Sequence, residues 1–231
     1  KIVDVLAGNY PVVARFQGGP NAGHSLHFEG KSFVLRSVPS GIFRQDAINI
    51  VGNGVVLDPI TFKGECDNIA KTGIPVTKRI VIAKKAHLIL PTHRLLDAAN
   101  EAAMGKSKIG STLKGIGPTY TDKIGRYGLR VGDILAADFE ERYAKLQNRH
   151  ITLLNQMGFE CDPHAEDAAF MEAVNFLKEF ELVDCEYYIN NLLKDNEILA
   201  EGAQGSMLDI DYGSYPFVTS STTSCSGACV G

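Results

Sequence analysis

A glycine-rich stretch near the start of the chain, FQGGPNAGH at residues 16–24, contains residue types that could bind a ligand. It follows an apolar run at residues 12–16, which predicts a loop at the end of a β-strand. Glycine lets a backbone approach a ligand closely, the Asn21 amide can donate and accept hydrogen bonds, and His24 can exchange a proton near neutral pH. These residues indicate a polar ligand site. A simple turn with a structural histidine is the alternative.

The composition narrows the classes of protein to consider. A chain of 231 residues, with 45% hydrophobic and 22% charged residues, is typical of one large or two small globular domains. A net charge of −4 gives no sequence-wide basic footprint, so we expect neither a nucleic-acid partner nor binding to an anionic membrane. No apolar run reaches the roughly 18 residues of a membrane span, and no signal peptide is recognisable. The sequence therefore predicts a cytoplasmic protein.

Five cysteines are scattered through the chain, at positions 66, 161, 185, 225 and 229. Their odd number, in a chain without an export signal, predicts reduced thiols. Cys225 and Cys229 form a single C-x3-C pair with no second pair nearby, which is a weak indication of zinc.

The elements that must position the loop at residues 16–24 alternate between strands and helices. Asp58 followed by Pro59 predicts a helix start, and Gly73 and Gly105 predict helix ends. Residues 106–133 read as a long polar loop of functional type. Strands are expected at residues 12–16, 25–28, 32–35, 48–57, 79–82, 87–90 and 198–200, and helices at residues 59–72, 92–104, 139–157, 165–180 and 185–193.

This order of elements predicts an α/β fold with a largely parallel central sheet and helices packed around it. We expect one domain over residues 1–231, with a helix-rich lobe inserted at about residues 138–195. Ligands of such folds gather at the carboxyl ends of the strands. The ordinary nucleotide motifs are absent: Ile116 stands where a P-loop needs lysine, and Leu57 where a dinucleotide fingerprint needs its third glycine.

Eight motifs, which follow one another in family order along nearly all of the chain, resemble adenylosuccinate synthetases. They are FQGGPNAGH (16–24), PSGIFR (39–44), GNGVVLDP (52–59), GIGPTYTDK (115–123), GLRVGD (128–133), EGAQG (201–205), LDID (208–211) and YPFVTSS (215–221).

The resemblance implies a GTP-dependent ligase of purine biosynthesis that joins IMP to L-aspartate through 6-phosphoryl-IMP, with Mg²⁺ as cofactor. The 6-oxo group of IMP is a poor leaving group, and its phosphorylation activates it for displacement by aspartate. By resemblance, His24 and Gln204 are the catalytic residues. Lys1, Gly23, His24 and Ser25 match the GTP-binding positions, and the backbone carbonyl of Gly23 matches a Mg²⁺ ligand.

The resemblance also implies an IMP site shared between the subunits of a homodimer. Thr112 and Thr219 match the hydroxyls that hold the 5′-phosphate, Gln204 matches the amide that reads the 6-oxo edge of the base, and Arg126 matches an arginine that reaches into the partner's site. The matched IMP-binding residues are Asn21, Ala22, Gly23, His24, Thr112, Arg126, Gln204 and Thr219.

The sequence departs from the family pattern in two respects. Leu113 stands where the family has glycine. A GDEGKG loop, which precedes the position of Lys1 in the family and supplies the catalytic base, is not in this chain, and neither is the family's C-terminal part. Because the chain also opens in mid-segment without methionine, we expect an excerpt of a longer protein that is inactive as a ligase by itself. A purine-nucleotide-binding module without catalysis is the alternative function.

Overall fold

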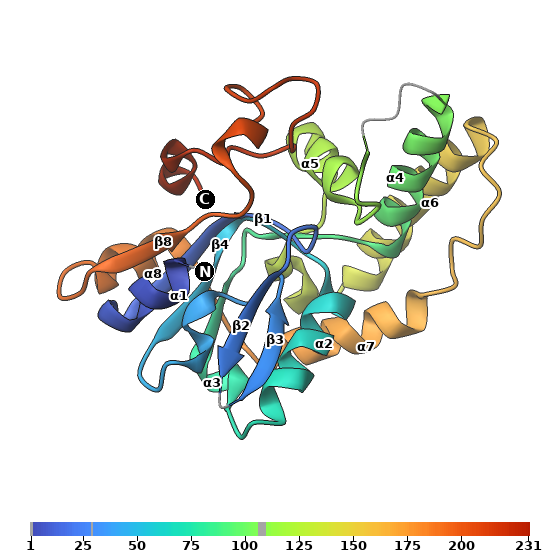
Figure 1. The fold of residues 1–231 in the computed structure, drawn as a ribbon. Coiled ribbons are helices and arrows are strands. Elements are labelled where there is room, and N and C mark those ends of the chain that lie inside the picture. The colour runs from blue at the N-terminus through green and yellow to red at the C-terminus, as the bar shows by residue number, and fades with distance from the viewer. Residues whose placement is uncertain (1, 29, 106–109) are drawn as a thin grey trace.

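A parallel β-sheet forms the centre of the molecule in the computed structural model, which describes residues 2–28, 30–105 and 110–231 (Figure 1). Its strand order is β7-β5-β4-β1-β8, and β6 pairs with β4 beyond this path. Every pair in this sheet is parallel, as predicted. The strands are β1 (Val12–Gly18), β4 (Ile48–Leu57), β5 (Ile80–Ala83), β6 (His87–Leu88), β7 (Glu181–Val183) and β8 (Ile198–Glu201).

The central strands are buried on both faces. Every residue of β1 and β5 is buried, and in β4 the side chains of Ile50, Val51 and Val55 are fully inaccessible to solvent. In the sequence, parallel strands that are covered by helices appear as continuous apolar runs, which is why these strands could be predicted. Arg15 and Gln17 are polar members of β1, and both are buried near its carboxyl end.

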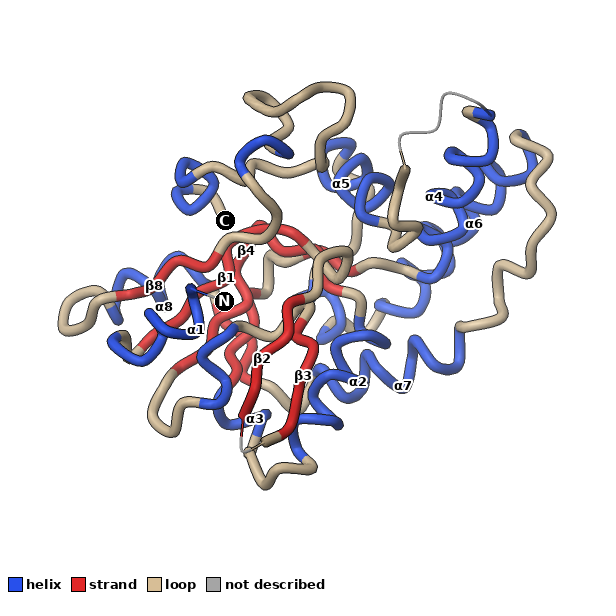
Figure 2. Tube along the Cα trace, viewed as in Figure 1, coloured by secondary structure: helices blue, strands red, loops and turns tan. Residues whose placement is uncertain are grey.

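A separate hairpin follows the glycine-rich loop. Strands β2 (His24–Phe28) and β3 (Lys31–Leu35) pair in antiparallel orientation, with Phe28 opposite Lys31. Gly30 takes a left-handed φ of 75°, which suits a tight turn, whereas Glu29 lies outside the described residues. The strands predicted at residues 25–28 and 32–35 are confirmed, and they form this hairpin. Its strands, labelled in Figure 2, form a two-stranded sheet of their own.

Helix α2 (Pro59–Ala70) begins as the sequence predicts. The Asp58 carboxylate accepts hydrogen bonds from the backbone N–H groups of Ile60 and Thr61 at 3.0 and 3.3 Å. This contact satisfies two of the donors that a helix start leaves free. The helix buries one apolar stripe in the main core, formed by Phe62, Cys66 and Ile69.

The other helices surround the sheet. Helix α4 packs against α5 and α6, while α7 packs against α2. Gly105 has a left-handed φ of 54° just beyond α4, in agreement with its predicted role as a terminator. Within the described ranges, no helix combines the length and apolarity that a membrane crossing requires. The bounds are α1 (Ile2–Leu6), α3 (Val76–Arg79), α4 (Pro91–Ala103), α5 (Ile116–Gly125), α6 (Phe139–Gln156), α7 (Asp167–Leu177) and α8 (Cys185–Leu192).

One prediction about elements is wrong, and one short strand was missed. The expected loop at residues 106–133 contains α5 and a short 3₁₀ helix, Val131–Leu135. Gly117 and Pro118 indicated a break, but they occupy the first turn of α5, where the N–H groups have no partner within the helix. Strand β7 was not predicted, because three residues are too few to show a period.

The span at residues 138–195 is helix-rich, and it contributes to the central layers. Its strand β7 pairs with β5, and its helix α7 packs on α2. The boundaries of a separate lobe therefore stay a prediction. All five cysteines are free thiols, and burial raises the pKa of Cys185 to about 11.

Candidate functional site

The loops that follow β1 and β8 meet at the carboxyl edge of the sheet, since the two strands are parallel neighbours. Gly18 has a left-handed φ of 84°, and a Cβ atom there would lie 2.7 Å from that of Ala203. A side chain at this position would therefore hold the two loops apart. Across the contact, Gln204 Nε2 donates a hydrogen bond to Asn21 Oδ1 at 2.9 Å.

A cavity of about 520 Å³ opens beside this contact, a volume that suits a small-molecule ligand. Its walls come from α4, from the start of α5 and from residues 204–220. Four residues with matched roles in IMP binding line it together: Asn21, Thr112, Gln204 and Thr219. Segments far apart in the sequence thus bring these four polar side chains to one cavity, whose lining also contains apolar side chains such as Ile116, Leu208 and Phe217.

Two carboxylates of α4 hold the segment that carries Thr112. Glu101 accepts hydrogen bonds from both backbone N–H groups of residues 110–111, each at 2.6 Å. Asp97 accepts one from the N–H of Gly115 at 2.9 Å. Hydrogen bonds to charged acceptors are stronger than neutral ones, so α4 fixes the backbone on both sides of Thr112.

Leu113, where the resembled family has glycine, adopts a left-handed φ of 56°. Leucine reaches this conformation at a cost of roughly 1–2 kcal/mol, whereas glycine adopts it readily. The backbone at this position therefore follows a path that glycine favours.

His24 opens β2, and its ring is oriented by a chain of buried groups. Its Nε2 atom lies 2.9 Å from the Ser40 hydroxyl. That hydroxyl donates to Oε1 of Glu201 at 2.9 Å, and the Ser40 N–H donates to Oε2 at 2.8 Å. Because the single hydroxyl proton points at the carboxylate, Ser40 can only accept from His24, so the proton on this side of the ring sits on Nε2.

Arg15 lies beneath the glycine-rich loop with only 2% of its surface exposed. Its guanidinium donates to the backbone carbonyl of Arg36 and, at 3.2 Å, to that of Gly19. Burial lowers the pKa of Arg15, while the negative charges of Glu201 and Glu65 act in the opposite direction. The buried Arg15 side chain thus links the glycine-rich loop, at Gly19, to the backbone of Arg36.

The remaining matched residues lie outside the cavity lining. Ala22 is half-buried, and Gly23 and Ser25 are exposed where the loop enters β2. Arg126 is exposed directly after α5, with a left-handed φ of 64°. Lys1 lies outside the described residues.

Sequence reasoning missed the groups that hold the matched residues in place. Ser40 and Glu201 lie inside recognised motifs, so those motifs could have pointed to them. Arg15 is a charge within an apolar strand, which is a usable signal. Asp97 and Glu101 are four residues apart on one helix face, a pattern too common to single out.

The fold and the site together define an α/β protein with a small-molecule-sized cavity, lined in part by polar side chains, at the carboxyl edge of a parallel sheet. Comparison with known proteins narrows this class. The sequence pattern of the family described as adenylosuccinate synthetase matches residues 1–231. The adenylosuccinate synthetases of Parabacteroides distasonis and Christiangramia forsetii are 60% and 57% identical to this chain over its full length. The chain spans 55% of the length of each.

Solved structures agree with this match. The fully ligated adenylosuccinate synthetase of Plasmodium falciparum superposes with a TM-score of 0.90 at 31% identity, over 100% of this chain and 54% of that one. The cyanophage S-2L succinoaminodeoxyadenylate synthetase, at 23% identity and a TM-score of 0.63, shares the fold over 98% of this chain and 54% of its own. The chain belongs to the adenylosuccinate synthetase family.

Proposed function

We propose that the protein containing this chain joins IMP to L-aspartate at the expense of GTP, giving adenylosuccinate, GDP and phosphate. The observation that carries the proposal is the cavity of about 520 Å³, where Asn21, Thr112, Gln204 and Thr219 converge. A nucleoside monophosphate needs a phosphate end and a base end, and this lining offers hydroxyls for one and amides for the other.

Gln204 has a specific role in this proposal. Its Nε2 donates to Asn21, while its Oε1 is buried and has no hydrogen-bond partner among the described residues. An unsatisfied buried acceptor is costly, so a donor on the ligand would stabilise the complex. The hypoxanthine of IMP offers such a donor, the N1–H group, next to its 6-oxo oxygen.

The reaction then proceeds in two displacements. The carboxylate base of the family's GDEGKG loop, which lies outside this chain, would take the N1 proton of IMP. The 6-oxo oxygen then attacks the γ-phosphorus of GTP and GDP leaves, which turns a poor leaving group into a phosphate ester. The aspartate amine attacks C6 and loses a proton, N1 and C6 regain their aromatic bonding, and phosphate leaves with the former 6-oxo oxygen. His24, held at Nε2 by Ser40, would in its protonated form donate a second hydrogen bond from Nδ1 to the GTP phosphates and stabilise the charge that develops on GDP.

Mg²⁺ binding by this chain would use the backbone carbonyl of Gly23. Mg²⁺ prefers oxygen ligands and commonly takes several from substrate phosphates, so one exposed carbonyl beside His24 fits such a site. The ion would neutralise charge on the transferring phosphoryl group.

Arg126 is proposed to complete the IMP site of a second subunit. Its side chain is exposed and does not line the cavity of its own chain. A guanidinium matches phosphate geometry, and a twofold dimer would place each Arg126 at the partner's cavity.

Mixing of variants tests both the reaction and the shared site. The complete enzyme should form adenylosuccinate only when GTP, IMP and L-aspartate are all present, and Arg126→Leu and His24→Asn should each be nearly inactive. Their mixture should regain about one quarter of wild-type activity, because half of randomly mixed dimers carry one intact site of two.

Separate outcomes contradict the two parts of this proposal. No product from the wild-type enzyme would overturn the reaction. Product from the wild type, but no recovery in mixtures shown to contain heterodimers, would overturn the shared site alone.

A further inference from the structure

A buried cluster of two histidines and one aspartate lies outside the cavity lining. His93 of α4 and His150 of α6 both direct Nε2 at the same oxygen of Asp122 on α5, at 3.0 and 2.8 Å. Both histidine side chains are 0% exposed, and the ring centres are 4.6 Å apart. Within the described part of the chain, no other group of three His, Cys, Asp or Glu residues is close enough to suggest a metal site.

The hydrogen bonds at Nδ1 of the two histidines distinguish a metal site from a cluster held by hydrogen bonds. The backbone N–H of Leu90 donates to Nδ1 of His93 at 2.9 Å, so Nδ1 carries a lone pair. The single proton of a neutral imidazole then sits on Nε2, which cannot bind a metal ion while protonated. The cluster is therefore a set of hydrogen bonds to a carboxylate.

His150 follows the same logic. Its Nδ1 lies 2.7 Å from the Thr92 hydroxyl, which can either donate or accept. Its Nε2 faces the carboxylate of Asp122, an acceptor, so the ring proton belongs on Nε2 and Thr92 donates to Nδ1. Both histidines thus donate from Nε2 to one anion.

The ionisation of the cluster agrees with this assignment. Burial lowers the pKa of His93 to about 4, against the opposing effect of its hydrogen bond to Asp122. Burial alone would raise the pKa of Asp122, but the hydrogen bonds from His150 and His93 outweigh it and hold that pKa well below its usual range.

Asp122 connects this cluster to the functional site through α5. On the same helix, the Tyr120 hydroxyl donates to the Gly54 carbonyl at 2.7 Å and accepts from the Gly18 N–H at 3.2 Å. The backbone carbonyl of Asp122 accepts from Tyr127 and Gly128, the residues that follow Arg126, at 2.9 and 3.2 Å. The position of Asp122 therefore sets where α5 meets the site and where the chain turns at Arg126.

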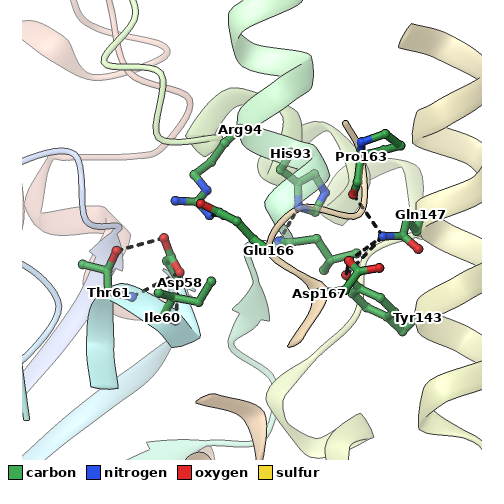
Figure 3. A network of polar contacts seen from close by, with 11 residues as sticks. Asp58, Ile60, Thr61, His93, Arg94, Tyr143, Gln147, Pro163, Glu166 and Asp167 are labelled. Atoms are coloured by element: carbon green, nitrogen blue, oxygen red, sulfur yellow. Dashed lines mark hydrogen bonds and ion pairs between the residues drawn. The ribbon is translucent and has the colours of Figure 1, made fainter. Parts of the chain in front are cut away.

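The two helices that carry the histidines are also anchored at the start of α7. Figure 3 shows Arg94 facing Glu166 in an ion pair, and Tyr143 and Gln147 directed at Asp167. The last two contacts measure 2.6 and 2.7 Å and hold α6 at the start of α7. The histidines thus donate to Asp122 from two helices whose positions are held by other contacts.

We propose that His93 and His150 are positioning residues, which fix α5 through Asp122 and thereby place Arg126 and the cavity wall at Ile116 and Gly117. This inference rests on the proposed function, because it concerns how the IMP site is held. Neither histidine touches the proposed substrate.

Variants of His150 in the complete enzyme test the proposal. Leucine removes the N–H donor, whereas glutamine can present one from the end of its side chain. His150→Leu should raise the KM for IMP about tenfold and leave the KM for GTP within about twofold, since a lost hydrogen bond to a charged group has about this effect. His150→Gln should restore the KM for IMP to within about threefold of the wild type.

Leu154→Ala is the matched control, because Leu154 is buried one turn further along α6 and is not part of the cluster. It should lower Tm with no change in the KM for IMP. An equal rise in that KM with Leu154→Ala, or no rise with His150→Leu, would overturn the proposal.

Nitrogen NMR of the imidazoles gives a readout that needs no activity. In the wild-type enzyme at pH 7, both rings should carry their proton on Nε2, and added zinc should leave their signals unchanged. A proton on Nδ1 of either ring, or a zinc-dependent shift, would overturn the proposal even if His150→Leu does not fold. Absence of ligase activity with the expected NMR signals would instead count against the proposed function.

Discussion

Replacement of His24 by asparagine in the complete enzyme is expected to lower kcat by roughly 10²- to 10⁴-fold, the range that a positioned acid contributes. Asparagine removes the imidazole that Ser40 and Glu201 hold at the start of β2. The Kd for IMP should stay within about threefold, because His24 does not line the cavity. Steady-state rates and calorimetric titration with IMP measure the two quantities.

His27→Asn is the matched control for this variant. His27 lies on the same strand and is exposed, so its replacement should leave both kcat and the Kd for IMP unchanged. If His24→Asn turns over at the wild-type rate, His24 has no part in the chemical step. A loss of IMP binding as large as the loss of rate would assign His24 to binding instead.

Acid is expected to destabilise the fold well above the pH at which carboxylates titrate. Burial lowers the pKa of both His87 and His93 to about 4 from 6.5, assisted at His87 by the charges of Lys123 and Arg130. The unfolded chain takes up these two protons around pH 6.5, whereas the folded chain takes them up only near pH 4. The free energy of unfolding should therefore fall by about 4 kcal/mol between pH 7 and pH 5, measured by urea titration at each pH.

Variants of single histidines separate this effect from general acid sensitivity. His87→Asn should remove about half of the change between pH 7 and pH 5, even if the variant is less stable overall. The exposed His27, replaced by asparagine, should leave the change intact. An unfolding free energy that is equal at pH 5 and pH 7 in the wild type would contradict the assignment of two neutral buried histidines.

Local chemistry explains which elements could be predicted. The cap at Asp58 and the apolar stripe after it specify α2 within a dozen residues, so the sequence sufficed. Helix α5 was not predicted because Gly117 and Pro118 are common both in loops and in the first turn of a helix. The choice between them depends on Tyr120 and Asp122, whose side chains are satisfied by distant β1, β4, α4 and α6.

The contacts within the candidate site were even harder to predict from the sequence than helix α5. Family motifs made Asn21, Thr112, Gln204 and Thr219 candidates for the site, because the resemblance assigns each a position in order along the chain, and the fold brings all four to one cavity. The resemblance did not identify what holds them. Ser40 and Glu201 are 161 residues apart, and no local sequence pattern predicts that they form hydrogen bonds with each other. Supporting contacts of this kind appear only once the fold brings the segments together.

Affinity for IMP compared with inosine is the most direct test of the proposed cavity. Thr219→Val in the complete enzyme should weaken IMP binding by roughly ten- to a hundredfold, because it removes a hydrogen bond to the 5′-phosphate. The same variant should bind inosine, which has no phosphate, as the wild type does. Thr121→Val, an exposed threonine of α5, should change neither affinity. Equal losses for IMP and inosine, or no loss for either, would contradict a phosphate end at Thr219.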